Sequence, residues 1–342
     1  MADMILKKKA LADFLRSLGR SYQVFGPKQE GGEVRFGPAD GEVLLDYQNS
    51  RLSPKEFFFP QSERMFEFNA DPKAEDAFLL KERPANLRPR LLFGIRPCDA
   101  KAFAVLDKIY GNDQYTDTYW FDKREATTLI GLACNRPCAT CFCTSVGCGP
   151  FHEEGLDVLA VDLGEDVLLR PLTDKGEKAL EAAGDLAKAG KKAAASAKAL
   201  KTEAESSITS RVDMDKVNER TVMELFEADH WAKVAQRCLN CGVCTYVCPT
   251  CHCFDIQDEV SGQIGDRVRN WDSCMSWLFT QHGTGHNPRP DKTSRVRQRF
   301  MHKFKYIPLK RGGDIGCVGC GRCVVQCPVN IDVRDVVRDM NA

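Results

Sequence analysis

The sequence predicts an α+β fold in two parts, an N-terminal α/β domain with a cysteine-rich loop and a mainly helical C-terminal domain. Three observations predict it. Apolar runs of strand length alternate with helical periodicity up to about residue 172. An Ala-, Lys- and Glu-rich stretch without aromatic residues follows, and the last third of the chain repeats one cysteine pattern. We therefore expect domains at 1–172 and 216–342, joined by a connector at 173–215.

The N-terminal domain begins with elements that carry no chemistry of their own. Apolar periodicity over residues 4–18 predicts a helix that stops at Gly19. Strand-like segments follow at 22–25, 34–36 and 43–47. These segments supply apolar residues for a core.

Cysteines first appear where two predicted strands end. The apolar strand 91–95 leads into a helix whose first turn contains Cys98 and Asp99, and a carboxylate suits the positive start of a helix. The strand 128–132 leads into a loop with five further thiols: Cys134, Cys138, Cys141, Cys143 and Cys148. Neighbouring strands of one sheet would place Cys98 beside this loop. Two more predicted strands, 157–161 and 166–170, close the domain.

Six thiols in one α/β unit indicate a metal site, although buried cysteines also pack as small apolar residues. A thiolate-rich ligand set suits an iron–sulfur cluster, and zinc is the alternative. A third [4Fe-4S] cluster is the interpretation we favour. Its ligands would be Cys98, Cys134, Cys141 and Cys143, with Cys138 as the substitute and Cys148 last in order.

The connector and the segment after it are expected to be helical. Residues 174–207 predict a solvated helix broken at Gly184 and Gly190, or a partly flexible link. The segment 216–237 predicts one helix. Its buried side would carry Val222, Leu225, Phe226 and Trp231.

The repeated pattern is C-x2-C-x2-C-x3-C-P, at 238–249 and again at 317–328. This run holds cubane clusters in bacterial ferredoxins, and in two-cluster ferredoxins the fourth cysteine ligates the other cluster. Glycines such as Gly242, Gly319 and Gly321 would let backbone amides approach the sulfur atoms. We therefore predict two [4Fe-4S] clusters in a dicluster ferredoxin domain, because two equal runs disfavour zinc or free thiols. The ligand sets are Cys238, Cys241, Cys244 with Cys327, and Cys317, Cys320, Cys323 with Cys248.

An insertion of 68 residues, 249–316, separates Cys248 of the first run from Cys317 of the second. It contains Cys251, Cys253 and Cys274, which either pack as apolar residues or form a further redox or metal site with His252. Its segment 289–311 has nine Lys or Arg residues against one acidic residue. We expect a solvated face, or a dock for an acidic partner that also offsets the thiolate clusters. The segment has few aromatic residues to stack on bases, which disfavours nucleic acid.

Composition narrows the function classes. The chain has 17 cysteines and no apolar leader or run near the roughly 18 residues of a membrane span, so we expect metal binding in the cytoplasm rather than disulfides. Lys plus Arg and Asp plus Glu are both 48, so net charge indicates no partner. No G-x-G-x-x-G after a strand, P-loop or nucleophile elbow is present. The chain is therefore not expected to bind a flavin, nicotinamide or nucleotide itself.

These motifs together resemble a family of dicluster iron–sulfur subunits, namely the A subunit of anaerobic sulfite reductase and the beta subunit of sulfhydrogenase. Similar subunits accompany heterodisulfide reductase complexes. The matching segments are 94–99, 131–134, 141–143, 248–255, 271–274, 286–290 and the closing cysteine run. The resemblance implies an electron-transfer subunit beside a flavin- and NAD(P)-binding subunit. It also favours Cys98, Cys134, Cys141 and Cys143 as the N-terminal ligands.

We therefore expect an iron–sulfur electron-transfer subunit of a multisubunit anaerobic oxidoreductase, without catalysis of its own. It would relay electrons between the flavin partner and a catalytic partner of hydrogenase, sulfite reductase or heterodisulfide reductase type. The alternative is a thiol-active subunit that reduces disulfides with Cys251, Cys253 or Cys274. A metal-binding scaffold without redox duty is a third reading.

Overall fold

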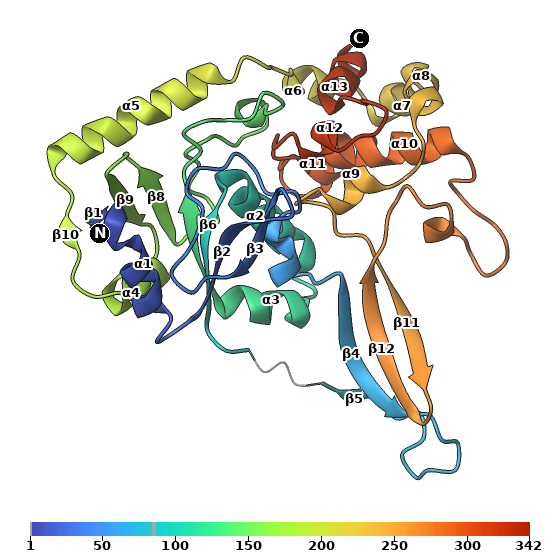
Figure 1. The fold of residues 1–342 in the computed structure, drawn as a ribbon. Helices are drawn as coiled ribbons and strands as arrows, with labels where there is room; N and C mark the ends of the chain where they lie inside the picture. The colour runs from blue at the N-terminus through green and yellow to red at the C-terminus, as the bar shows by residue number, and fades with distance from the viewer. Residues whose placement is uncertain (1, 84–86) are drawn as a thin grey trace.

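The computed structural model describes residues 2–83 and 87–342 and has a mixed α/β architecture, which confirms the predicted fold class. Figure 1 shows a twisted sheet with helices on both faces, a helical C-terminal part, and a narrow β-arm that extends away from the body. In the described part of the chain, no helix combines the length and apolar composition needed to cross a membrane.

The larger sheet has the strand order β10-β1-β9-β8-β7-β6-β2-β3. Its centre is parallel, because β2, β6, β7 and β8 run in one direction, and the outer strands are antiparallel. The predicted pairing of the two cysteine-bearing strands is confirmed, since Leu92 of β6 lies opposite Leu129 of β7. The strands are β1 (Met4–Lys7), β2 (Gln23–Glu30), β3 (Glu33–Pro38), β6 (Arg90–Ile95), β7 (Thr127–Leu132), β8 (Val158–Asp162), β9 (Asp166–Pro171) and β10 (Ala187–Lys188).

Both faces of this sheet are covered, so its central strands are apolar on both sides. In β6, Leu91 and Phe93 join the core beneath α1 (Leu11–Leu18) and α4 (Asp174–Ala182). Leu92 and Ile95 join the core beneath the helices of the other face. Those helices are α2 (Pro97–Tyr110), α3 (Thr118–Glu125) and α5 (Lys191–Ser207).

Two N-terminal predictions were wrong in detail. The predicted helix over 4–18 starts only at Leu11, because residues Met4–Lys7 form β1 and pair with β9 and β10. The segment 43–47 is not a strand. Its apolar side chains pack against the core, and the Tyr47 hydroxyl donates a hydrogen bond of 2.5 Å to the Gly94 carbonyl. A short 3-10 helix, η1 (Lys8–Ala10), links β1 to α1.

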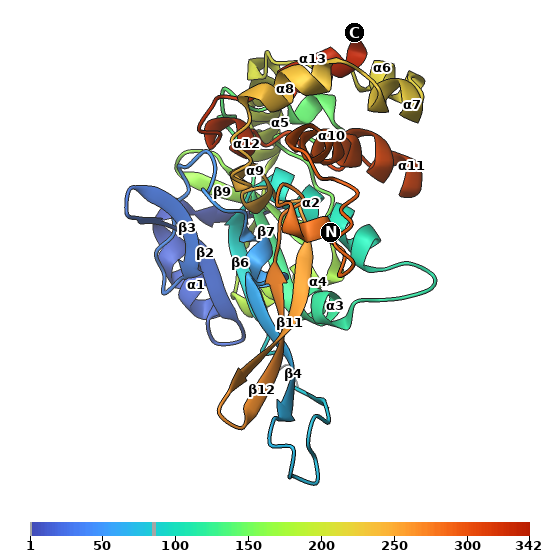
Figure 2. The ribbon, with the colours of Figure 1, turned by 90° about the vertical axis from the view of Figure 1, so that its right-hand side faces the viewer.

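The β-arm joins segments from both halves of the chain (Figures 1 and 2). Its strand order is β11-β12-β4-β5, and β12 pairs antiparallel with β4. At its base the Arg269 guanidinium, 2 % exposed, contacts Glu63 and Asp117 at 2.6 Å each. The insertion between the cysteine runs therefore contains a hairpin. The strands are β4 (Ser62–Asn69), β5 (Lys81–Glu82), β11 (Phe254–Ser261) and β12 (Ile264–Trp271).

The C-terminal helices surround a separate apolar core. The single helix predicted at 216–237 was wrong, because a capping box between Thr221 and Glu224 starts a new helix there. Phe226, predicted to be buried, is 36 % exposed. The predicted breaks at Gly184 and Gly190 agree with the end of α4 at Ala182 and the start of α5 at Lys191. The helices are α6 (Met214–Glu219), α7 (Val222–Phe226), α8 (His230–Arg237), α10 (Lys292–Met301), a π-helix (His302–Tyr306), α11 (Ile307–Lys310) and α13 (Val333–Asn341).

Candidate metal centres

The two cysteine runs fold in the same way. Each wraps into one short helix, α9 (Val243–Tyr246) or α12 (Arg322–Val325), and the helices lie against each other. Each helix is preceded by a glycine in the left-handed region, Gly242 at φ 74° and Gly321 at φ 72°. A side chain there would strain the tight turn that gathers the thiols.

Backbone amides of both runs point at sulfur atoms. The Asn240 amide donates to the Cys238 sulfur at 3.3 Å, and the Gly319 amide donates to the Cys317 sulfur at 3.5 Å. Asn240 and Gly319 occupy equivalent positions, and both have positive φ. Such N–H···S bonds are among the interactions that adjust the potential of an iron–sulfur cluster.

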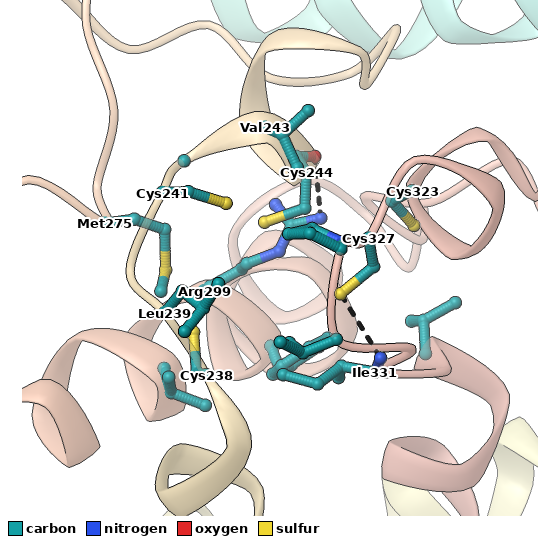
Figure 3. Close-up of a pocket in the computed structure, with 16 residues that line it drawn as sticks. Cys238, Leu239, Cys241, Val243, Cys244, Met275, Arg299, Cys323, Cys327 and Ile331 are labelled. Carbon is teal, nitrogen blue, oxygen red and sulfur yellow. Dashed lines mark hydrogen bonds between the residues drawn. The ribbon is translucent and has the colours of Figure 1, made fainter.

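One cavity, here called the first-run cavity, is lined by thiols of both runs: Cys238, Cys241, Cys244 and Cys327. Figure 3 shows these side chains around it, with Arg299 reaching toward Cys244. The Ile331 amide donates to the Cys327 sulfur at 3.2 Å. The remaining wall is largely apolar, and Cys323 also reaches it. The structure thus brings the fourth cysteine of the second run to the first run.

The reciprocal group, here called the middle thiol set, consists of Cys248, Cys317, Cys320 and Cys323. The hydroxyl of Thr250, two residues after Cys248, donates to the Gly316 carbonyl at 2.7 Å and so holds the runs together. Burial, opposed by Lys303 and reinforced by the charge of Cys248, raises the pKa of Cys317 to about 12. Cys248 also acts on the pKa values of Cys320 and Cys323.

A third group of thiols surrounds the N-terminal cavity, which lies at the carboxyl ends of β6 and β7. Such ends are the usual ligand-binding edge of a parallel sheet. Five candidate ligands line it, together with one member of the middle set: Cys98, Cys134, Cys138, Cys141, Cys143 and Cys320. Cys148 instead packs with Cys143 and Ile208. Cys138 and Cys141 both line this cavity.

The N-terminal loop and the second run are in direct backbone contact. The Phe142 amide donates to the Gly319 carbonyl at 2.9 Å. A Cβ atom on Gly319 would lie 2.5 Å from the Cys143 Cα, and one on Gly321 would lie 2.2 Å from the Thr140 hydroxyl. These glycines therefore have a role that the sequence did not reveal, because they allow the cysteine loop of the other domain to approach.

Comparison with known proteins agrees with this geometry. The model of the 4Fe-4S dicluster domain matches residues 237–331, which include both runs. The chain is 30% identical, over 353 residues and 98% of each chain, to sulfhydrogenase 2 subunit beta of Pyrococcus furiosus.

The chain belongs to the sulfhydrogenase beta-subunit family.

The resemblance drawn from the motifs is thus confirmed, and so is an oxidoreductase-type iron–sulfur protein with a 4Fe-4S domain. That relative is one subunit of a multisubunit complex. No solved structure matches the chain.

A buried ion pair joins the two parts of this family member. The Arg322 guanidinium of α12 contacts the Asp99 carboxylate of α2 at 2.7 Å, and both side chains are at most 3 % exposed. The Ser53 hydroxyl donates to Asp99 at 2.8 Å. The sequence predicted Asp99 only as a helix-start residue. Burial raises the pKa of the Cys320 thiol of the middle set, Arg322 opposes this shift and Asp99 adds to it.

The basic segment 289–311 is not a solvated face, because Arg295, Arg299, Lys303 and Lys305 are all buried. The Arg299 guanidinium donates to the Cys244 carbonyl at 2.8 Å and lies 3.7 Å from the Cys251 sulfur. The Lys303 ammonium donates to Thr250 and Gly316. The sequence analysis expected that this segment could offset the thiolate clusters but singled out no residue. The four-residue spacing of Arg295, Arg299 and Lys303 beside an apolar helical stripe could have revealed them.

Three further thiols lie beside the middle set. The neighbouring Cys251 thiol lowers the pKa of Cys248. At the base of the β-arm, the Cys274 thiol likewise lowers the pKa of its neighbour Cys253. Burial lowers the pKa of His252 to about 4, so its imidazole is neutral at pH 7.

The residues present fit iron–sulfur clusters on several grounds. The thiols surround cavities, and amides and buried cations face them. Burial raises the pKa of the Cys143 thiol to about 12. A thiolate at such a site needs iron or a cation beside it.

Proposed function

We propose that this chain is an electron relay in which three [4Fe-4S] clusters form one continuous path. The two outer clusters would occupy the first-run cavity and the N-terminal cavity, and the middle thiol set would hold the cluster between them. The ligands of the N-terminal cluster would be Cys98, Cys134, Cys141 and Cys143. Each cluster would exchange one electron at a time, and the chain supplies the ligands, amide hydrogen bonds and charges.

One observation carries this proposal, namely that the middle set touches both cavities. Cys323 reaches the wall of the first-run cavity, and Cys320 reaches the wall of the N-terminal cavity. The Cys141 sulfur also lies 3.8 Å from the Cys320 carbonyl oxygen. An electron on the middle cluster would therefore have a short route to either neighbour.

Exposure distinguishes one end of the path. Cys241 of the first-run cavity is exposed, whereas the middle set and the four proposed N-terminal ligands each have two buried and two partly exposed thiols. We infer that a flavin- and NAD(P)-binding subunit contacts one end and a catalytic redox subunit the other, as the beta-subunit family suggests.

The isolated, fully loaded chain should accept electrons from dithionite or a reduced flavoprotein, with loss of visible absorbance. It should not be reduced by NADH or NADPH alone, because the sequence contains no dinucleotide-binding motif. Anaerobic absorbance titration of the single chain measures both. Flavin that stays bound through purification, or reduction by NAD(P)H without a partner, would contradict the relay. Addition of a flavoprotein reductase is the positive control.

A further inference from the structure

Two buried cations on one helical ridge have no acidic partner. Arg299 lies in the last turn of α10 and Lys303 follows one turn later in the π-helix, and they are 3 % and 5 % exposed. Within residues 2–83 and 87–342, their partners are backbone carbonyls, a hydroxyl and a sulfur rather than a carboxylate. An uncompensated buried charge is strongly unfavourable, so an anion of another kind is expected beside each.

Arg299 lies between the two ferredoxin sites. Its guanidinium donates to the carbonyl of Cys244, a first-run ligand, and the same side chain lines the first-run cavity. Its other terminal nitrogen faces Cys251, which touches Cys248 of the middle set. The charge of Arg299 therefore acts on both sites.

Lys303 acts on the middle set alone. Its ammonium donates to the Thr250 hydroxyl at 2.8 Å, and that hydroxyl lies 3.3 Å from the Cys248 sulfur. It also donates to the carbonyl of Gly316, the residue before Cys317, at 3.0 Å. Lys55 of the N-terminal domain reaches the same place and donates to the Cys251 carbonyl at 2.7 Å.

The outer sites have less uncompensated positive charge. At the N-terminal cavity, the charge of Arg322 is balanced by Asp99, which leaves Arg96 bound to the backbone carbonyls of Leu132 and Ala133. At the first-run cavity, Arg299 is the buried cation in the wall, and it is shared. The middle set faces Arg299, Lys303 and Lys55 together.

We propose that Arg299 and Lys303 set the reduction potentials of the ferredoxin clusters and make the middle cluster the most easily reduced of the three. This inference rests on the proposed function. Reduction adds one negative charge to a cluster that thiolates already make anionic, and burial opposes this change. Fixed cations offset that cost most strongly where they are most numerous. Arg299 also weakens the repulsion between two reduced neighbours, so both ferredoxin clusters can hold an electron together.

The test is a redox titration of the fully loaded chain, followed by electron paramagnetic resonance. The Cys248→Ser variant identifies the middle-cluster signal by its loss. Lys303→Met should lower the potential of the middle cluster alone, by about tenfold in the reduction equilibrium or about 59 mV. Arg299→Met should lower the potentials of both ferredoxin clusters, and Lys303→Arg should restore the wild-type value.

Two other buried cations of the same helical segment give matched controls. The Lys305 ammonium donates to the carbonyls of Val217 and Asn218, and the Arg295 guanidinium donates to those of Arg289 and Pro290. Lys305→Met and Arg295→Met should leave every potential unchanged, because these cations do not contact a thiol site.

Unchanged potentials in loaded Lys303→Met would overturn the inference, as would a middle cluster that is reduced last in the wild type. If Lys303→Met does not assemble, Lys55→Met decides in its place, because Lys55 lies outside the ferredoxin domain. It should lower the middle potential, and an unchanged value would overturn the inference. Failure of the proposed function would look different, since the loaded wild type would then show fewer than three reducible clusters.

Discussion

Replacing Cys248 with Ser is expected to remove the cluster of the second cysteine run and to spare the cluster of its own run. The reason is the exchange of fourth ligands, which places Cys248 with Cys317, Cys320 and Cys323. Loss of one thiolate ligand should lower the iron content by about four atoms per chain. A structural effect of the substitution alone would instead disturb the nearer run.

Cys327→Ser is the reciprocal variant and should remove the cluster held by Cys238, Cys241 and Cys244. Iron analysis and paramagnetic spectra of both single variants measure the pattern, and Cys148→Ser is a control that lies outside both ferredoxin ligand sets. If each substitution eliminated the cluster of its own run, the pairing would be wrong.

Removal of iron should unfold the C-terminal half. The buried cations Arg299 and Lys303 would lose their anionic partners, and each uncompensated buried charge costs about 3–5 kcal/mol. Two such losses are comparable with the total stability of a typical domain, about 5–15 kcal/mol. The thiolates themselves converge from segments that are far apart in the sequence, so little else gathers them.

Chelated protein should therefore lose helical circular dichroism and become protease-sensitive after about residue 210. The N-terminal sheet has its own apolar cores on both faces and should resist proteolysis longer. An iron-free chain with a compact, protease-resistant C-terminal half would refute this expectation.

The sequence predicted those strands and helices that have a clear apolar periodicity of their own. The strands before Cys98 and Cys134 were predicted because buried parallel strands are continuous apolar runs. The arm was not, because β4 pairs with β12 across some 200 positions and no local pattern encodes that partner. The three helices after residue 213 were merged into one, since a capping box in a polar segment is a weaker signal than the apolar repeat.

The candidate ligands were predictable because a short segment must wrap tightly around a cubane cluster to ligate several of its iron atoms, and this fixes the spacing of the cysteines. The charged residues around these ligands could not be predicted from spacing. Asp99 and Arg322, for example, are in contact although they are 223 positions apart in the sequence. Arg299 and Lys303 were noticed only as members of a basic segment. Their contacts depend on how α10 and the π-helix pack against the runs, and spacing alone does not give that packing.

The most direct test of the relay is the number of electrons that the isolated chain accepts. Coulometric reduction of fully reconstituted protein, with iron analysis of the same sample, should give about three electrons and about twelve iron atoms per chain, at one electron and four irons per cluster. Two electrons and about eight irons, with one equivalent of zinc, would make the N-terminal site structural and contradict a path of three clusters.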